Sequence, residues 1–499
     1  MAFLDFIVNW VNNPASERGL VLFGQAGTGK SSIAHEIARL FDKMHRLTSS
    51  FIIHRREKSV QKSYHLFTTL VHNLADRYPS FKIALGTVVK DNTALRVGTC
   101  DCDVLFESLI LEPLKDLHIV GPILVIIDAL DEIGGDTTSG IALHDFLAEN
   151  LKRLPSNFRV LITSRPEHAI VSALAGAPSV KVKYMNDTEL AAETHKDILA
   201  FLWKKLPSDT FGDYMEALAV KAEGLFQWAA VASQLVLDPP ERFDYDGVTC
   251  IEHLLEPSTN RRGQDLLDDL YKEVLEGYFT GQESRDLFRS VVGQLITSIE
   301  PLTMRSLITL RQHDPYKKRS DAAVTGLLHR LGSLLSNVNP SDSNFPIIPL
   351  HTSFRDFLIN KDKSGDFCVG VRDAHHQLAH SCLGLLRDGL KFNICELETS
   401  YLANDNVEDL NTRIDQHIPS ALLYACRFWG DHLKHTDFNT DLFGKVEPLF
   451  KEKLLFWLET LSLTRNIGLA PSAFVTLNMW LVSSRGVSTY FYWSDEKCQ

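Results

Sequence analysis

Eight residues near the start of the chain have the types and spacing that hold a row of phosphates. The segment Gly24–Ser31 reads GQAGTGKS and fits the pattern G-x-x-x-x-G-K-[ST] at every position. Its glycines allow a tight turn whose N–H groups face inward, and a following helix offers its positive N-terminal end. We expect Lys30 to reach the β- and γ-phosphates and Ser31 to bind Mg²⁺. The predicted nucleotide-binding residues of this loop are Gly24, Gln25, Ala26, Gly27, Thr28, Gly29, Lys30, Ser31 and Ser32.

The segments on either side of the loop support this interpretation. Gly19–Phe23 is a short apolar run typical of a buried strand, and apolar residues recur at helical spacing from Ile33 to Phe41. The alternative is a glycine-rich turn in an unrelated sheet, which the strand-loop-helix context disfavours. We therefore expect the chain to bind a purine nucleoside triphosphate together with Mg²⁺.

A second strand ends in carboxylates. The run Ile123–Ile127 is followed by Asp128, Ala129, Leu130, Asp131 and Glu132. We expect Asp128, at the strand tip, to act on Mg²⁺ directly or through its water. A carboxylate one turn further on can polarise the attacking water, and Glu132 is the first choice for that role, with Asp131 the second. The alternative is a solvated acidic loop.

A third strand has a polar tip, in the segment RVLITSRP at 159–166. Thr163, Ser164 or Arg165 is expected to sense the γ-phosphate, and Arg165 is the candidate that we place in the site. An arginine makes two parallel hydrogen bonds to phosphate oxygens. The alternative is a surface arginine that follows a strand by chance.

Strands and helices alternate over the first 185 residues, which predicts a parallel sheet with helices on both faces. The predicted strands are Gly19–Phe23, Phe51–His54, Ile123–Ile127, Val160–Thr163 and Val180–Val182. The fold class is therefore an α/β P-loop NTPase domain, followed by helical and winged-helix domains. The winged helix is predicted from three helices, ending with Ser320–Leu335, a strand at Pro346–Leu350 and a helix at His351–Ile359.

These patterns divide the chain into five segments. We predict a nucleotide-binding domain at 1–185, a first helical domain at 186–245, a winged-helix domain at 246–362, a second helical domain at 363–465 and an unassigned tail at 466–499. The segment Asn466–Ser484 carries no charged residue. We expect it to be buried or covered by a partner, with a membrane span as the alternative.

The composition indicates which classes of partner and which cellular compartment to expect. The formal net charge is −12, which disfavours a broad nucleic-acid-binding face, because such faces cluster Lys and Arg. The eight cysteines show no pattern of a zinc site and are expected to be reduced thiols. The N-terminus lacks the basic leader and cleavage site of a signal peptide. We expect a cytoplasmic protein that binds neither nucleic acid nor membrane.

The sequence also resembles a known family. The segments GQAGTGKSS, ILVIIDALDE and RVLITSRPE resemble the NACHT domain of signal-transduction NTPases. The chain is most similar to the fungal NLR-like set that has a nephrocystin-type N-terminal module, is related to heterokaryon-incompatibility proteins and usually carries WD repeats. The segments Leu266–Leu275, Ile348–Leu358 and Leu422–Leu433 extend this resemblance to about residue 460.

The resemblance implies a slow nucleotide switch in an innate-immunity or self/non-self recognition pathway. In the family the ADP form is closed, and exchange for ATP opens the molecule and permits self-association. A histidine that begins an H-x-S-F motif contacts the ADP β-phosphate, and His351 stands at that position. Many relatives have a Gly-x-Pro motif whose proline packs on adenine. Here Phe226 follows Gly224 and Leu225 in place of that proline.

Several alternatives stay open from the sequence alone. A conventional P-loop ATPase or phosphotransferase with steady turnover would use the same loop, and a nucleotide-locked scaffold would hydrolyse nothing. ATP is favoured over GTP because no N-K-x-D motif appears where one would be needed. No effector domain or repeat array is recognised, so the effector or sensor partners are unknown. We expect either a naturally short member of the family or a piece of a longer protein.

Overall fold

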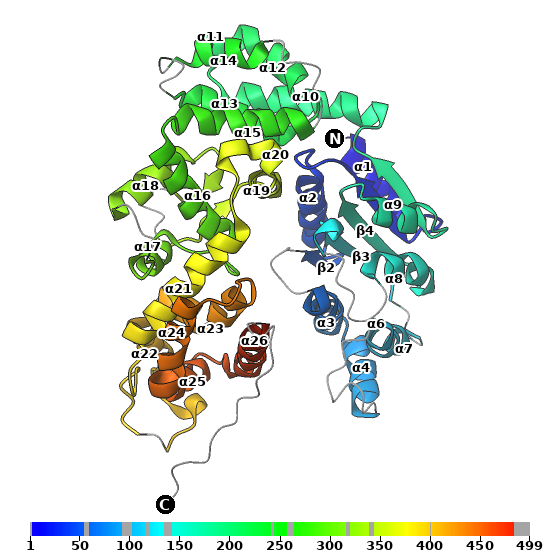
Figure 1. The fold of residues 1–499 in the computed structure, drawn as a ribbon. Coiled ribbons are helices and arrows are strands. Elements are labelled where there is room, and N and C mark those ends of the chain that lie inside the picture. The colour runs from blue at the N-terminus through cyan, green and yellow to red at the C-terminus, as the bar shows by residue number, and fades with distance from the viewer. Residues whose placement is uncertain are drawn as a thin grey trace, which may run out of the picture. The chain divides into compact units, whose positions relative to one another are not determined.

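The computed structural model of the chain forms two compact units (Figure 1). The first consists of Met1–Pro239 and Phe243–Leu270, and the second of Pro240–Arg242 and Tyr271–Gln499. The structure describes residues 2–53, 59–91, 102–115, 117, 119–133, 142–240, 244, 246–256, 264–315, 320–338, 344–399 and 401–483.

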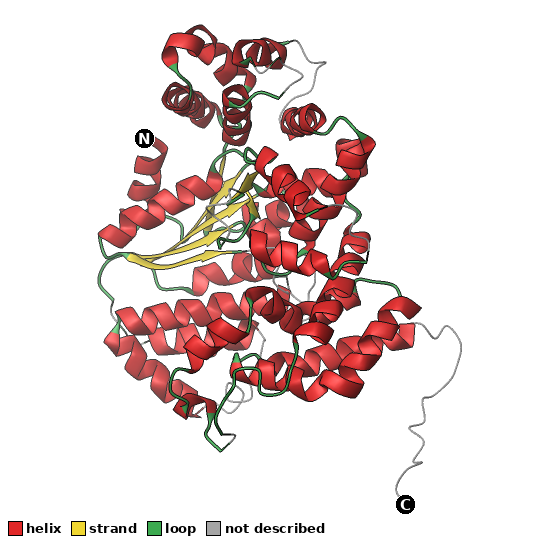
Figure 2. Cartoon of the chain, turned by 90° about the vertical axis from the view of Figure 1, so that its left-hand side faces the viewer, coloured by secondary structure: helices red, strands yellow, loops and turns green. Residues whose placement is uncertain are grey.

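A five-stranded parallel sheet is the centre of the first unit (Figure 2). Its strands are β1 (Gly19–Phe23), β2 (Leu47–Ile52), β3 (Ile123–Asp128), β4 (Phe158–Ser164) and β5 (Val180–Tyr184). Their order across the sheet is β2-β3-β4-β1-β5. Strand β4 therefore lies between the strand that precedes the phosphate loop and the strand that ends in carboxylates.

Helices cover both faces of this sheet, as predicted. Helices α1 (Ala2–Asn12) and α2 (Lys30–Lys43) pack on one face, against Leu20, Ile126 and Leu161. Neighbouring strand residues point the other way. They meet the helices α3 (Ser59–Arg77), α4 (Pro79–Asp91), α6 (Cys102–Phe106), α7 (Glu112–Leu114), α8 (Leu143–Asn150) and α9 (His168–Ala175).

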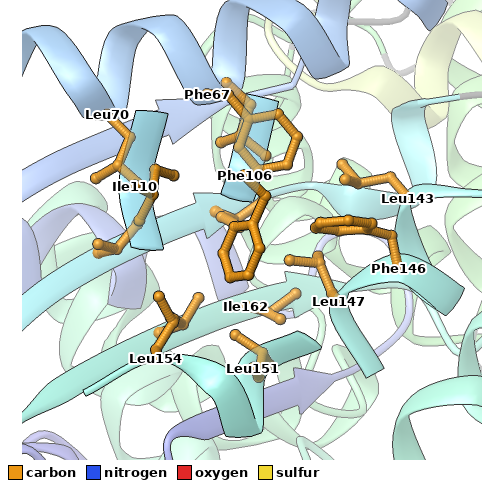
Figure 3. Packing of buried hydrophobic residues seen from close by; sticks show 14 of the residues in the cluster. Phe67, Leu70, Phe106, Ile110, Leu143, Phe146, Leu147, Leu151, Leu154 and Ile162 are labelled. Atoms are coloured by element: carbon orange, nitrogen blue, oxygen red, sulfur yellow. The ribbon is translucent and has the colours of Figure 1, made fainter. Parts of the chain in front are cut away.

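Three phenylalanines form the centre of the larger core (Figure 3). The ring centroids of Phe67, Phe106 and Phe146 lie 5.4–6.2 Å apart in edge-on pairs. Edge-to-face contacts of this kind add to the free energy gained by burying the rings. This core fixes α3, α6 and α8 on the sheet, and so fixes the strands whose ends form the site.

Helices make up the rest of the first unit. They are α10 (Thr188–Lys205), α11 (Ser208–Phe211), α12 (Met215–Lys221), α13 (Phe226–Leu237) and α14 (Gly247–Leu255). Gly224 has a positive φ of 81°, a conformation that glycine adopts without strain. The chain turns there, and α13 begins two residues later.

The second unit contains three helices followed by an antiparallel pair of short strands, the order predicted for a winged helix. The helices are α16 (Gln282–Thr297), α17 (Met304–Gln312) and α18 (Asp321–Arg330), and the strands are β6 (Leu335–Ser336) and β7 (Ile348–Pro349). Helix α15 (Gln264–Tyr278) precedes them and continues across the boundary between the two units.

Further helices follow β7 in this unit. They are α19 (Thr352–Ile359), α20 (Lys361–Ser364), α21 (Val371–Gly389), α22 (Leu410–His417), α23 (Ser420–Lys434), α24 (Thr440–Pro448), α25 (Leu454–Leu463) and α26 (Ala470–Ser483). The fold class predicted from the sequence is thus confirmed, whereas the exact domain boundaries stay predictions.

Two predicted elements were misplaced. The second strand was predicted at Phe51–His54, but β2 occupies Leu47–Ile52 and His54 lies outside the described residues. Three polar residues, Thr48, Ser49 and Ser50, interrupt the apolar pattern of this strand, so the apolar run marked only its end. The helix predicted to reach Leu335 ends at Arg330, where the chain passes into tighter turns: the N–H groups of Leu331 and Gly332 donate to the carbonyls of Leu328 and His329.

The uncharged segment near the end of the chain is partly buried. Leu477 and Trp480 of α26 are buried, whereas Met479 is 64% exposed. No helix in the described part of the chain is long and apolar enough to cross a membrane. The described cysteines are free thiols, and all but Cys368 are buried.

Two buried histidines connect α21 to α23. His375 Nδ1 lies 2.9 Å from His432 Nδ1, and His432 Nε2 lies 2.8 Å from the Tyr424 hydroxyl, which accepts a hydrogen bond from the Ile299 N–H at 3.0 Å. Burial lowers the pKa of His375 to about 4, with contributions from His435 and Arg355, and it lowers the pKa of His432 well below its usual value. The folded state therefore requires both rings to be neutral.

This pair predicts a loss of stability in acid. The unfolded chain takes up protons near pH 6.5, whereas the folded His375 resists protonation until about pH 4. The free energy of unfolding should therefore fall as the pH drops from 6.5 towards 4, by about 1.4 kcal/mol per pH unit for each proton. Urea unfolding between pH 7.5 and 4.5 measures this. His375→Gln should flatten the profile, and the control His72→Gln, at a side chain 73% exposed, should not. Identical profiles for all three proteins would contradict the assignment.

Candidate nucleotide-binding site

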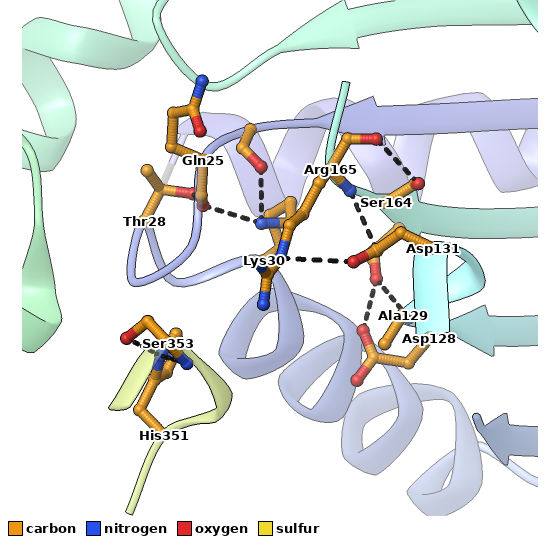
Figure 4. A network of polar contacts seen from close by, with 12 residues as sticks. Gln25, Thr28, Lys30, Asp128, Ala129, Asp131, Ser164, Arg165, His351 and Ser353 are labelled. Atoms are coloured by element: carbon orange, nitrogen blue, oxygen red, sulfur yellow. Dashed lines mark hydrogen bonds and ion pairs between the residues drawn. The ribbon is translucent and has the colours of Figure 1, made fainter. Parts of the chain in front are cut away.

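Three neighbouring strand ends bring the predicted site residues of the first unit together (Figure 4). The phosphate loop follows β1, Arg165 follows β4, and Asp128 ends β3. Parallel strands end on the same side of a sheet, where ligands of such sheets bind. The structure therefore brings together, at the carboxyl ends of these strands, groups that lie as much as 141 residues apart in the sequence.

The phosphate loop requires its glycines. Gly27 and Gly29 have φ angles of 83° and 90°, in the left-handed region that glycine adopts without strain. A Cβ on Gly24 would lie 2.6 Å from Met185 Cγ, and a Cβ on Gly27 would lie 2.8 Å from Gln227 Cβ. Space and backbone conformation thus both exclude side chains here. The first turn of α2 starts after Gly29 and leaves Ser31 and Ser32 exposed.

Lys30 folds back over the loop. Its Nζ donates hydrogen bonds to the carbonyls of Gly24 at 2.7 Å and Gln25 at 2.8 Å. Burial lowers the pKa of this ammonium to about 8, although Asp131 and Asp128 oppose the shift. Lys30 thus lies among the loop carbonyls, where the negative charge of a bound phosphate would raise its pKa again and favour its charged form.

Asp128 is held by a hydroxyl from the next strand. Thr163 Oγ1 donates to Asp128 Oδ1 and accepts a hydrogen bond from the Ala129 N–H at 3.0 Å. Ala129 has a positive φ of 60°, which is strained for a residue with a side chain. Asp128 is 5% exposed. Thr163, one of the three candidates for phosphate sensing, therefore serves here to orient the carboxylate.

Arg165 is paired with Asp131. The Arg165 backbone N–H donates to Asp131 Oδ1 at 2.9 Å, and its Nε lies 3.2 Å from Asp131 Oδ2. Both carboxylate oxygens of Asp131 are thus engaged, and its side chain is only 3% exposed. Glu132, on the same turn, is also buried at 7% exposed, and its N–H donates to the Ala129 carbonyl. Asp131 therefore serves to hold Arg165, and the assignment of the base to Glu132 stays a prediction.

The oxygen groups present fit a magnesium ion. Ser31 offers an exposed hydroxyl and Asp128 an oriented carboxylate, and hard oxygen ligands suit Mg²⁺. Among the described residues no group of three or more His, Cys, Asp or Glu side chains is arranged to hold a metal. Proteins that bind magnesium with nucleotides supply only one or two side-chain ligands, and phosphates and waters supply the others.

The start of α13 also borders the loop, which the sequence did not reveal. The Gln227 N–H donates to the Gly27 carbonyl at 3.2 Å. A Cβ on Gly29 would lie 3.4 Å from the Phe226 ring. The sequence indicated Phe226 only through its position in the family motif. It did not indicate that Gln227 and Met185 lie beside the loop, because each is more than 150 residues away from it in the chain. A helix start next to the loop joins the helical part of this unit to the phosphate site.

His351 belongs to the second unit, where it caps α19. Its Nδ1 accepts a hydrogen bond from the Ser353 N–H at 3.1 Å and lies 2.7 Å from Ser353 Oγ. A ring nitrogen that accepts from a backbone N–H carries no proton, so the neutral ring has its proton on Nε2. Ser353 Oγ lies 2.8 Å from the Tyr271 hydroxyl. His351 is therefore fixed in the form that can donate a hydrogen bond to an anion.

Comparisons with known proteins agree with this geometry for the N-terminal part of the chain. The family model described as nephrocystin 3, N-terminal, matches residues 5–165, about a third of the chain. No curated protein sequence matches. The nephrocystin-type N-terminal module expected from the sequence is thus confirmed over these residues, and they form an NTPase-like module.

Similarity to solved structures is weak. A STAND protein (signal transduction ATPase with numerous domains) with a tetratricopeptide repeat sensor from Pyrococcus horikoshii is 14% identical, with a TM-score of 0.38, over 97% of this chain and 67% of that one. The Drosophila ORC bound to DNA is 12% identical, with a TM-score of 0.30, over 67% and 86% of the two chains. Cdc6p from Pyrobaculum aerophilum is 13% identical, with a TM-score of 0.30, over 70% and 89%. Likenesses at this level support no inference about function.

The lowered pKa of Lys30 predicts that nucleotide binding weakens in alkali. In the protein without nucleotide, Lys30 loses its proton near pH 8. Bound phosphates would raise the pKa of this lysine, so that it would keep its proton to a higher pH. Affinity for ATP should therefore fall above pH 8, by up to about tenfold per pH unit. The nucleotide phosphates, whose pKa is about 6, are already ionised there.

Calorimetry between pH 7.5 and 9.5, in buffers of different ionisation enthalpy, measures both the affinity and the proton uptake. The control Lys30→Arg should bind without this proton uptake, because a guanidinium stays charged throughout the range. Equal affinity of the wild-type protein at pH 7.5 and 9.5 would contradict the assignment.

Proposed function

We propose that this chain is an ATP/ADP-dependent molecular switch of the NACHT type within the signal-transduction NTPases. The observation that carries the proposal is the meeting of three polar strand ends in one unit: the phosphate loop with Lys30, the oriented Asp128, and the pair of Arg165 with Asp131. These groups supply phosphate binding, a magnesium position and a group that distinguishes three phosphates from two.

Arg165 is the proposed sensor of the γ-phosphate. Its guanidinium is held by Asp131, and a γ-phosphate would compete with that carboxylate for the same donors. ADP lacks the competing group and would leave the pair intact. Binding of ATP would thus change an interaction on the acidic turn that carries Glu132. A ligand shifts a conformational equilibrium only through such a difference between two states.

ATP hydrolysis in this proposal is slow and uses Glu132 to polarise water. Asp131 is assigned a different role, that of holding Arg165, because both of its carboxylate oxygens contact that residue. Mg²⁺ would be held by Ser31, Asp128 and the phosphates, and it would supply charge neutralisation. Turnover at about 1–100 per second would favour a conventional P-loop ATPase instead.

His351 is the proposed contact of the ADP β-phosphate. The Nε2 proton makes it a hydrogen-bond donor, and Ser353 and Tyr271 hold the ring. Tyr271 lies on α15, the helix that also carries Leu267 beside Gly27 in the first unit. We propose that this helix transmits the nucleotide state between the units. ATP-dependent self-association and a role in innate immunity or self/non-self recognition, with the five domain boundaries predicted above, belong to the same proposal.

Phe226 is the proposed neighbour of the adenine ring. Its ring lies beside Gly29, and an aromatic face can stack on a purine. This would let the residue take the place of the proline found in many relatives. It would also favour a flat base without distinguishing adenine from guanine.

Two matched variants test the assignment of the base. Glu132→Gln should slow ATP hydrolysis by at least about a hundredfold and leave ATP binding intact, because the amide keeps the shape of the side chain but cannot accept a proton. Asp131→Asn should retain most of the turnover, since Asp131 pairs with Arg165. Single-turnover hydrolysis and ATP affinity are measured for both variants. The reverse pattern would assign the base to Asp131, and unchanged turnover in both would exclude hydrolysis at this turn.

A third variant tests the switch. His351→Ala should speed ADP release by at least about tenfold, because a hydrogen bond to a charged group contributes about 1.5–3 kcal/mol. Release of a fluorescent ADP analogue after mixing with excess ADP measures this rate. Tyr271→Phe, which removes only a hydroxyl behind the histidine, should give a smaller effect in the same direction. An unchanged release rate and an unchanged oligomeric state in His351→Ala would show that this histidine does not hold ADP.

A further inference from the structure

A groove lies at the amino ends of strands β2 and β3, whereas the phosphate loop lies at the carboxyl ends of the sheet strands. Leu47 begins β2 and Pro122 directly precedes β3. Both residues line the groove, together with residues from the last turns of α2 and α3. The volume of the groove is about 910 Å³, within the roughly 300–1,000 Å³ of pockets that bind small molecules. This groove is therefore separate from the nucleotide site.

Two arginines line this groove without a carboxylate partner. Arg46 directly precedes β2, and Arg77 is the last residue of α3. Asp42 and Asp76 also line the groove, but neither arginine forms an ion pair with a described residue. Asp76 Oδ2 lies 3.2 Å from His72 Nδ1 instead. The groove thus holds two positive charges that the protein leaves available to an anion.

Each guanidinium is held through one nitrogen and keeps its other donors. Arg77 Nη1 donates to the Leu47 carbonyl, and Arg46 Nη1 donates to Asn12 Oδ1 at 3.1 Å. No other described group accepts a hydrogen bond from either side chain, so neither arginine caps the carbonyls at the end of α2 or α3. An arginine has five N–H donors in a planar fork. The Nε and Nη2 groups can therefore bind the oxygens of a phosphate.

The residue after Arg77 adds a neutral donor. Tyr78 lines the groove and is partly exposed. Its hydroxyl forms no hydrogen bond with a described residue and is not enclosed. A phenol hydroxyl can donate one hydrogen bond and accept others. Two adjacent residues at the end of α3 thus offer a charged donor and a neutral donor to the same groove.

The carboxylates of the groove restrict what the rest of the ligand can carry. Asp42 and Asp76 lie on the last turns of α2 and α3, and both are exposed. A carboxylate repels a second anionic group, but it accepts hydrogen bonds from hydroxyl groups. A ligand with one anionic group and several hydroxyl groups therefore fits this groove better than a polyanion does. Sugar phosphates have this composition.

We propose that this groove binds a phosphorylated sugar. The phosphate of this ligand contacts Arg46 and Arg77. Its hydroxyl groups donate hydrogen bonds to Asp42 and Asp76. Helix α2 begins at the phosphate loop and ends at this groove, so one helix contacts both ligands. The site goes beyond the proposed function, because its ligand is neither hydrolysed nor exchanged for ADP.

Calorimetry with glucose 6-phosphate tests the proposal on the full chain. The wild-type protein and Lys30→Ala, which removes the nucleotide site, should bind it with equal affinity. Arg46→Gln and Arg77→Gln should each weaken binding at least about tenfold, because each removes charge-assisted hydrogen bonds to the phosphate. Both variants should still bind ATP, which shows that they are folded. The control Arg39→Gln, at an arginine that pairs with Glu36, should bind the sugar phosphate like the wild type.

Chemical protection gives a second readout that needs no substitution. Phenylglyoxal modifies accessible arginines, and the modified positions are identified by peptide mass spectrometry. Glucose 6-phosphate should slow the modification of Arg46 and Arg77 in the wild-type chain and leave that of Arg39 unchanged. Glucose, which lacks the phosphate, should protect none of these arginines.

A third variant separates a sugar phosphate from an anion alone. Asp42→Ala should weaken the binding of glucose 6-phosphate, because it removes an acceptor of sugar hydroxyls, and should not weaken the binding of inorganic phosphate. Three outcomes would overturn the proposal. The first is no binding of glucose 6-phosphate at millimolar concentration. The second is binding that Lys30→Ala abolishes, which would assign it to the phosphate loop. The third is inorganic phosphate that binds as tightly as the sugar phosphate.

Discussion

The chemistry of the candidate site depends on the position of β4 between β1 and β3. This order places Thr163 next to Asp128 and Arg165 next to Asp131, one strand away from the phosphate loop. A hydroxyl and a guanidinium from one strand thereby fix the two carboxylates of the neighbouring strand. The cores on both faces of the sheet hold these strands in order, and so they position groups that lie outside the cores themselves.

Much of this site could be predicted from the sequence because its signals are local. The phosphate loop has a fixed spacing, and a buried strand in front of Asp128 is recognised by its apolar run. The role of Thr163 could not be predicted, because it depends on which strand lies beside which. The contact of Gln227 with Gly27 could not be predicted either, because it joins segments far apart in the chain. The start of β2 was misplaced because the polar residues Thr48–Ser50 interrupt its apolar pattern.

The charged groups of the site have partners within the protein itself. Lys30 is held by loop carbonyls, Asp131 by Arg165 and Asp128 by Thr163. Each of these contacts joins two groups of the protein, so the network orients the site from within the chain. What a third phosphate can change is the partner of Arg165. In our account, this one exchange of partners separates the ATP form from the ADP form.

The identity of the nucleotide that the purified protein retains tests the central claim most directly. The chain would be purified without added nucleotide and denatured, and the released compound identified by chromatography, with Lys30→Ala treated in parallel. A switch that rests in its ADP form predicts nearly one ADP per chain in the wild type and none in the variant. An empty wild-type protein that turns over ATP rapidly would contradict the switch and assign the site to a conventional ATPase.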